Sequence, residues 1–178
     1  MVYAAAYCQS SSLEILKKHN FDDSKVLKES QRSKMFTELT ESPHIGYAIT
    51  SISPQDISSG MLSRSKYNLN EMAHDTTIAL IRTLVSPPYS LNITEIYIDT
   101  VGPPDSYRLK LCKMFPDVPL IVVCKKADSI YPIVSAASIC AKVTRDCELV
   151  NWEFVEKEDG DAFDRVFGSG YPAGKLDF

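Results

Sequence analysis

Two short apolar runs in the second half of the chain limit the possible fold more than any other feature. They are residues 93–99, ITEIYID, and residues 118–124, VPLIVVC, and a helical pattern follows each of them. Short runs rich in Ile and Val are typical of buried strands. Strands that alternate with helices predict a sheet covered by helices on both faces. In such folds, functional groups gather at the carboxyl ends of the parallel strands.

The first half of the chain adds two further strand patterns, at residues 2–8 and 44–52. We therefore expect an α/β fold in which a mixed sheet is flanked by helices. Helical patterns cover residues 11–20, 29–40, 67–86, 102–115 and 132–157, and Ser53-Pro54 marks the start of one more helix.

The composition narrows the functional classes. A chain of 178 residues, 44% of them apolar, can bury the core of one domain. Its net charge of −4 argues against binding nucleic acid by bulk charge alone, although a local basic groove is compatible with it. Five cysteines without a C-x-x-C pair predict reduced core residues of an intracellular protein, rather than disulfides or a zinc site. No apolar run is long enough to span a membrane, so we expect no membrane partner.

Two carboxylates are the candidate catalytic groups. Asp99 ends one predicted strand, and Asp128 lies four residues beyond the next. If these strands are parallel neighbours, both carboxylates lie at the same edge and can hold Mg²⁺ for phosphoryl transfer. Asp99 also fits a turn cap. Asp128 fits a cap less well, because a helix that starts at Pro132 has its cap position at Tyr131.

The helix after Pro132 has a polar and an apolar face. Its N-terminus lies near Asp128, where free N–H groups and the helix dipole suit an anionic ligand. For the two basic residues of the polar face we favour solvated surface. The polar face consists of Ser135, Ser138, Lys142 and Arg145, and the expected core face of Ile133, Ala137, Cys140, Ala141, Thr144 and Cys147.

Three further polar motifs each have two interpretations. The lysines at 125 and 126 either end a strand in solvent or neutralise a phosphate. Asp23, Ser24 and Lys25 form a tripeptide whose more frequent meaning is a helix N-cap. Tyr171, held between glycine and proline in GSGYP, is either a stacking platform for a base or sugar, or packs against its own loop.

Five segments together resemble the type 2 ribonuclease H family: IYIDTVGPP, KKADSIYPIVSAASICAKVTRD, DDSKVLKE, KYNLN and FGSGYP. The resemblance runs along nearly the whole chain and is most specific over residues 125–146. It is closest to the eukaryotic catalytic subunits. It implies a ribonuclease H-like fold.

The resemblance also implies an endonuclease that hydrolyses the RNA strand of RNA–DNA hybrids and cleaves at ribonucleotides embedded in duplex DNA. Products carry 3′-hydroxyl and 5′-phosphate ends, and the two-metal mechanism uses Mg²⁺ or Mn²⁺. The implied setting is the nucleus, with roles in RNA primer removal, ribonucleotide excision, DNA replication and repair, alongside two accessory subunits.

The resemblance implies roles for particular residues. Asp99 and Asp128 match two of four acidic metal ligands. Lys25, in the Asp-Ser-Lys motif, is expected near substrate phosphate, and Tyr171 matches a tyrosine that stacks on a sugar at the RNA–DNA junction. The full set of expected substrate-binding residues is Asp23, Ser24, Lys25, Asn68, Lys126 and Tyr171.

One motif of the family is missing from this chain. The family opens with a strand that carries Asp-Glu-Ala-Gly-Arg-Gly, just ahead of the segment that resembles MVYAAAYC. That strand supplies the other two acids, and its Gly-Arg-Gly reads the 2′-hydroxyl that distinguishes RNA from DNA. Because the strand is central to the sheet, we expect strand edges without partners.

We therefore expect residues 1–160 to form a ribonuclease H-like catalytic domain without its first strand. Residues 161–178 are expected to be a Gly-rich loop that begins a shortened C-terminal region. Two hypotheses follow: a hybrid-specific endonuclease, or a non-catalytic remnant that binds hybrid or partner subunits without cleavage.

Overall fold

The structure is a computed structural model that describes residues 1–18, 29–65, 67–100 and 102–153. The four strands are β1 (Val2–Cys8), β2 (Ile45–Ser51), β3 (Glu95–Asp99) and β4 (Leu120–Cys124). The helices are α1 (Leu13–Lys18), α2 (Glu29–Glu41), α3 (Pro54–Leu62), α4 (Leu69–Val85), α5 (Pro104–Met114) and α6 (Pro132–Val150). Two short 3₁₀ turns, η1 (Ser10–Ser12) and η2 (Ala127–Ser129), precede α1 and α6. Apart from the end of α6, the predicted strands and helices are confirmed within a few residues in these ranges.

The start of α3 and the end of α6 test two sequence signals. Ser53 caps α3, and its Oγ accepts the backbone N–H of Asp56 at 3.0 Å, as the Ser53-Pro54 pair predicts. The prediction that the last helix runs to residue 157 is wrong, because α6 ends at Val150. Asn151 closes that end, where both its backbone N–H and its side-chain amide donate to the carbonyl of Cys147.

The strands pair in two separate sheets. β1 and β2 are antiparallel, from Val2 opposite Ser51 to Cys8 opposite Ile45, whereas β3 and β4 are parallel. Antiparallel and parallel pairing both occur, but in two separate sheets rather than in the one mixed sheet expected, and no hydrogen-bonded ladder joins the two pairs among the described strands. Within that part of the chain β1 bonds only to β2 and β3 only to β4, in line with the expected unpaired edges.

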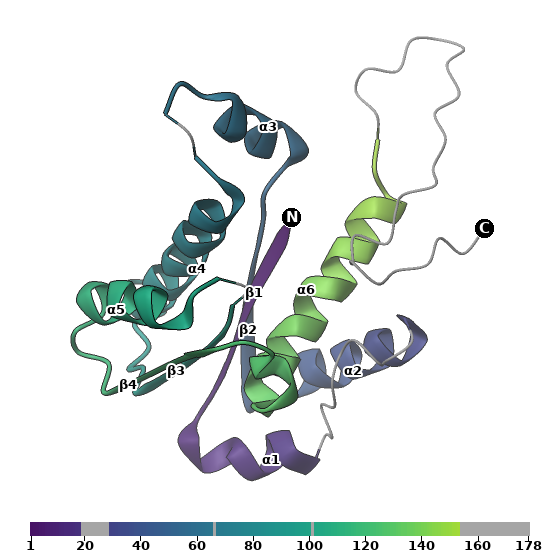
Figure 1. The fold of residues 1–178 in the computed structure, drawn as a ribbon. Coiled ribbons are helices and arrows are strands. Elements are labelled where there is room, and N and C mark those ends of the chain that lie inside the picture. Colours follow the sequence, from purple (N-terminus) through teal and green to yellow (C-terminus); the bar gives the residue numbers. More distant parts are fainter. Residues whose placement is uncertain (19–28, 66, 101, 154–178) are drawn as a thin grey trace.

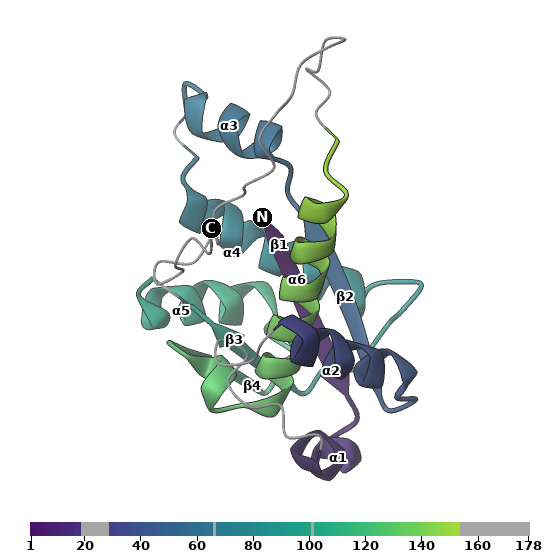
Figure 2. The ribbon, with the colours of Figure 1, turned by 90° about the vertical axis from the view of Figure 1, so that its right-hand side faces the viewer.

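Helices flank both sheets. Figure 1 shows α6 and α2 on one side of β1 and β2, and α4 on the other side. Figure 2 shows α6 running along β1, with α2 beside it. In the described ranges, no helix is both long and apolar enough to cross a membrane.

Two hydrophobic clusters form the core. The first joins β3 and β4 to α4 and α5, and the second joins α6 to β1, β2, α1 and α2. The first cluster contains Ile78, Ile81, Ile96, Tyr107, Leu111, Phe115, Ile121 and Val123, and the second contains Leu16, Leu39, Ile45, Ala136, Ile139 and Cys140. The described core thus places a packed layer beneath each sheet and holds α6 against β1.

The predicted faces of α6 are partly wrong. Ser135 was expected on the polar face but is fully buried, in a helix that packs against β1, α2 and η2. Cys147 was placed in the core but is exposed, because the last turn of α6 extends beyond the core cluster. Lys142 and Arg145 are half-buried rather than solvated, and Arg145 pairs with Asp146 at 2.8 Å. All five cysteines are free thiols, but the expectation that they are core residues is met by Cys140 alone, since Cys8, Cys112 and Cys124 are half-buried and Cys147 is exposed.

A glycine in β2 leaves room for a tyrosine ring of β1. Gly46 lies opposite Tyr7, whose ring occupies the space that a Cβ at position 46 would fill. We expect Gly46→Ala to lower the free energy of unfolding by about 1–3 kcal/mol, the usual cost of overpacking. Urea unfolding measures this. The same substitution in a Tyr7→Ala background should cost clearly less, and equal costs in both backgrounds would contradict the steric explanation.

Candidate metal centre

The two candidate carboxylates come from neighbouring parallel strands. β3 and β4 run in register, and Asp99 lies opposite Cys124 at their carboxyl ends. Beyond Cys124 the chain makes a tight turn and enters η2, which carries Asp128. Parallel pairing therefore brings Asp99 and Asp128 to the same edge of the sheet, as predicted.

A backbone hydrogen bond joins the two strand ends. The N–H of Ala127 donates to Oδ1 of Asp99 at 3.1 Å, so the carboxylate of Asp99 contacts the residue just before Asp128. The N–H of Thr100 also donates to the carbonyl of Cys124 at 3.2 Å. Asp99 thus accepts a backbone N–H, as a turn cap does, but its partner is 28 residues away. The bond ties β3 to η2 and does not close a local turn.

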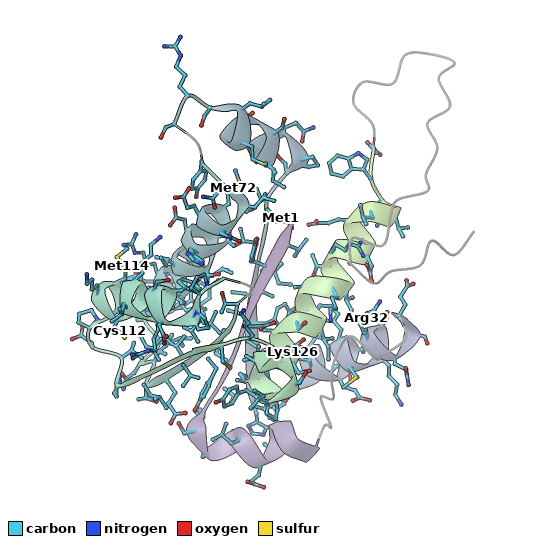
Figure 3. The ribbon with its side chains drawn as sticks, in the orientation of Figure 1. Met1, Arg32, Met72, Cys112, Met114 and Lys126 are labelled. Atoms are coloured by element: carbon cyan, nitrogen blue, oxygen red, sulfur yellow. The ribbon has the colours of Figure 1, made fainter. Side chains whose placement is uncertain are left out.

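Lys126 makes this bond possible through its backbone. It adopts the left-handed conformation, with φ 57° and ψ 36°, which is uncommon for residues other than glycine. The turn directs the next N–H, that of Ala127, toward Asp99. Figure 3 shows Lys126 where β4 leads into α6, and its side chain is exposed. That position is compatible with both predicted interpretations, a solvated strand end and a phosphate contact.

Asp128 is almost completely buried, with 3% of its surface exposed, whereas Asp99 is exposed. Aspartate is rarely buried to this extent unless its charge has partners. The cap position of α6 is Tyr131, whose side chain makes no capping hydrogen bond, and Pro132 is the first helical residue. The cap position falls on Tyr131, as predicted, and not on Asp128. The first turn of α6 carries no acidic side chain, so its positive dipole end is available to an anion.

The structure gives Asn68 a role that the sequence analysis missed. Its Oδ1 accepts the backbone N–H groups of Asn70 and Glu71, both at 3.0 Å. Glu71 returns the contact, since its Oε2 accepts the N–H of Asn68 at 3.2 Å. This capping box starts α4. The signal was present in the sequence as a capping residue with Glu three positions later, ahead of an apolar stripe. The expected substrate contact of Asn68 stays a prediction.

The other predicted substrate-binding residues cannot be placed. Asp23, Ser24, Lys25 and Tyr171 lie outside the described residues. Their roles stay predictions from the resemblance.

A second polar cluster, on α4 and α5, was not anticipated. Asp75 accepts hydrogen bonds from Lys110 at 2.8 Å and from Tyr67 at 3.0 Å, and the bond from Lys110 is the main reason why its pKa is lowered. His74 stacks on Tyr107, with ring centroids 3.6 Å apart. Burial, and then the charge of Lys110, lowers the pKa of His74. This cluster joins two helices and contains none of the predicted site residues.

The family follows from a match along nearly the whole chain. The family model for ribonuclease HII matches residues 1–176. The chain belongs to the ribonuclease HII family. It is 44% identical over 172 residues to a subunit of ribonuclease H2 from Homo sapiens, an alignment that covers 97% of this chain and 56% of the human protein. This ribonuclease HII chain therefore spans little more than half the length of the curated relatives it matches.

Solved structures of ribonuclease HII proteins and their relatives share the fold. The ribonuclease HII in a complex with PCNA from Archaeoglobus fulgidus is 26% identical, with a TM-score of 0.74 over 98% of this chain and 74% of that one. Bst-RNase HIII in complex with Mn²⁺ is 22% identical, with a TM-score of 0.67 over 84% of this chain and 47% of that one. The predicted family and fold class are confirmed.

Proposed function

We propose that this protein is an endonuclease that hydrolyses the RNA strand of RNA–DNA hybrids and cleaves at ribonucleotides embedded in duplex DNA. The observation that carries the proposal is the convergence of Asp99 and Asp128 at one edge of the β3–β4 sheet, in a chain of the ribonuclease HII family. Carboxylates at that edge suit metal-assisted hydrolysis of a phosphodiester.

The donor set fits a hard divalent cation. Mg²⁺ is commonly bound by one or two carboxylates and completes its coordination with water and substrate phosphate. Across the described ranges, no group of three or more His, Cys, Asp or Glu gathers that could hold a metal, so two carboxylates are the set that the structure offers. Mg²⁺ or Mn²⁺ is the proposed ion, and the Mn²⁺ in the related ribonuclease HIII supports this choice. When bound, such an ion polarises a phosphate and lowers the pKa of a water molecule that it binds. We further propose that two such ions act together, as in a two-metal mechanism.

The side chains divide the remaining work. Asp99, exposed at the strand end, would supply an oxygen ligand to the ion, and the N–H of Ala127 orients its carboxylate. Asp128 contributes a carboxylate that burial shields from bulk water. The exposed ammonium of Lys126 neutralises a substrate phosphate at the same edge. From the resemblance, Lys25 supports the phosphate and Tyr171 stacks at the RNA–DNA junction.

A binding protein without catalysis is the second candidate function. It is favoured by the two-carboxylate donor set and by the separate strand pairs of the described residues. Two carboxylates alone hold Mg²⁺ weakly, because the ion keeps much of its water. Two names support protein partners: the archaeal relative is in a complex with PCNA, and the human relative is a subunit of ribonuclease H2. We propose that accessory subunits are among these partners. A nuclear location is also part of the proposal.

Cleavage of a duplex with one embedded ribonucleotide separates the two functions. We expect the chain to bind an RNA–DNA hybrid with an affinity that falls as salt rises, and to cleave both substrates with Mg²⁺ or Mn²⁺. A matched chain that begins with an added Asp-Glu-Ala-Gly-Arg-Gly strand is assayed beside it. Binding without cleavage by the chain as given would support the second function. The endonuclease proposal would be refuted if neither chain cleaved either substrate and if Asp128→Asn did not change hybrid binding.

A further inference from the structure

The strand that carries Asp99 has two different faces. Ile96 and Ile98 pack into the cluster with α4 and α5, so alternation places Glu95, Tyr97 and Asp99 on the opposite face. Tyr97 therefore lies on the same face as the candidate ligand, two residues earlier in the strand.

A second tyrosine reaches the same face from the other side of the candidate centre. Tyr131 follows Asp128 by three residues, and its ring packs on Tyr97 with centroids 4.5 Å apart and planes 37° apart. Its backbone N–H donates to the carbonyl of Ala127 at 2.8 Å, and its own carbonyl accepts from Ser135 in α6 at 3.1 Å. Tyr131 is thus fixed to η2, to α6 and to β3 at once.

The ring of Tyr97 is itself held in place. Its hydroxyl donates to Oε2 of Glu95 at 2.7 Å, and this bond is the main reason why its pKa is raised to about 12. Both tyrosines are half-buried, whereas the carboxylate partner Glu95 is exposed. Tyr97 is therefore an ordered, neutral surface for the second ring.

These contacts form a closed circuit around Asp128. Asp99 accepts from Ala127, Ala127 accepts from Tyr131, Tyr131 packs on Tyr97, and the strand returns to Asp99. Within this circuit, the hydrogen bond from Ala127 attaches η2 to β3 directly, and the ring contact attaches the residue that follows η2 closely, Tyr131, to the same strand. The hydrogen bond uses an oxygen of the candidate ligand Asp99, whereas the ring contact uses none.

We infer that Tyr131 and Tyr97 are positioning residues that fix Asp128 relative to Asp99. This inference rests on the proposed metal-binding role of the two carboxylates. The rings would still hold the turn that carries Asp128 if a cation competed with the N–H of Ala127 for the same oxygen of Asp99. Removing the ring of Tyr131 frees η2 to shift along β3, so the two carboxylates no longer meet one ion in a fixed geometry. Partners that orient metal ligands commonly contribute 10- to 100-fold to metal affinity.

Mn²⁺ binding to the full chain tests the inference. Titration followed by electron paramagnetic resonance gives the dissociation constant for wild type, Tyr131→Ala, Tyr131→Leu, Tyr131→Phe and Tyr97→Leu. We expect the variants that lose a ring to bind Mn²⁺ about 10- to 100-fold more weakly than wild type. Tyr131→Phe keeps the ring, so its affinity for Mn²⁺ should stay within about 2-fold of wild type. Circular dichroism identifies the folded variants, and Tyr131→Leu keeps apolar volume where Tyr131→Ala does not fold. Tyr89→Ala, at a tyrosine that is 54% exposed outside the circuit, is the control and should bind Mn²⁺ as wild type does.

The outcomes separate this inference from the proposed function. If wild type binds Mn²⁺, Asp128→Asn weakens binding and folded Tyr131→Leu and Tyr97→Leu do not, the positioning role is wrong and the metal site stands. If wild type does not bind Mn²⁺, both proposals are overturned. A loss in Tyr131→Phe equal to that in Tyr131→Leu would also overturn the inference, because the ring would then not be the acting group.

Discussion

Asp128→Asn is expected to weaken Mn²⁺ binding at least about 100-fold and to abolish cleavage of a hybrid. Asparagine keeps the size of the side chain and removes its charge, so the buried position stays filled while one anionic ligand is lost. The magnitude follows from the 10- to 100-fold that residues supporting metal ligands contribute, since a direct ligand contributes at least as much. Calorimetric titration with Mn²⁺ and a gel assay on a labelled RNA–DNA hybrid measure the two effects.

Asp117→Asn is the matched control for this prediction. Asp117 is an exposed aspartate in the turn before β4, so the substitution makes the same change in net charge at the surface. It should leave metal affinity and cleavage at wild-type values. If the two variants behave alike, a metal-binding role for Asp128 is ruled out.

Leu111→Ala is expected to lower the free energy of unfolding by about 2–5 kcal/mol. Leu111 is fully buried in the cluster that joins α5 to β3 and β4, and truncation removes both buried apolar surface and packing contacts. Domains are stable by only about 5–15 kcal/mol, so this single change removes a large part of the total. Urea unfolding followed by circular dichroism measures it.

The same helix offers a matched control for the core. Leu109 lies on α5 with 55% of its surface exposed, and Leu109→Ala should change stability by no more than about 0.5 kcal/mol. Similar losses for Leu109→Ala and Leu111→Ala would show that α5 does not pack on the β3–β4 sheet through Leu111.

The elements around the candidate centre were predictable because their signals are local. The apolar runs 93–99 and 118–124 contain β3 and β4, and Pro132 begins α6 where expected. The placement of Asp99 and Asp128 at the same edge of the sheet followed from one topological step, that consecutive strands joined by a helix run parallel. The position of the cap at Tyr131 also followed from proline chemistry alone.

The remaining features depend on contacts between distant segments, which local patterns do not contain. Which strands pair is such a property, so the separation of β1–β2 from β3–β4 could not be predicted from their patterns. The burial of Ser135 is another, because helical spacing gives its neighbours on α6 but not the elements that cover it. Asn68 differs from both, because its capping box is visible in the sequence as an asparagine followed three positions later by Glu71.

The left-handed backbone of Lys126 restricts which residues evolution can place before η2. Glycine adopts this conformation without cost, asparagine and aspartate adopt it more readily than other residues, and an unbranched side chain tolerates it at moderate cost. Valine, isoleucine and threonine are strongly disfavoured because of their branched Cβ. Natural variation at position 126 should therefore follow backbone shape as much as charge. Proteins with glycine or asparagine there would keep the turn while losing the ammonium group, and comparing their salt dependence of hybrid binding would isolate what that charge contributes.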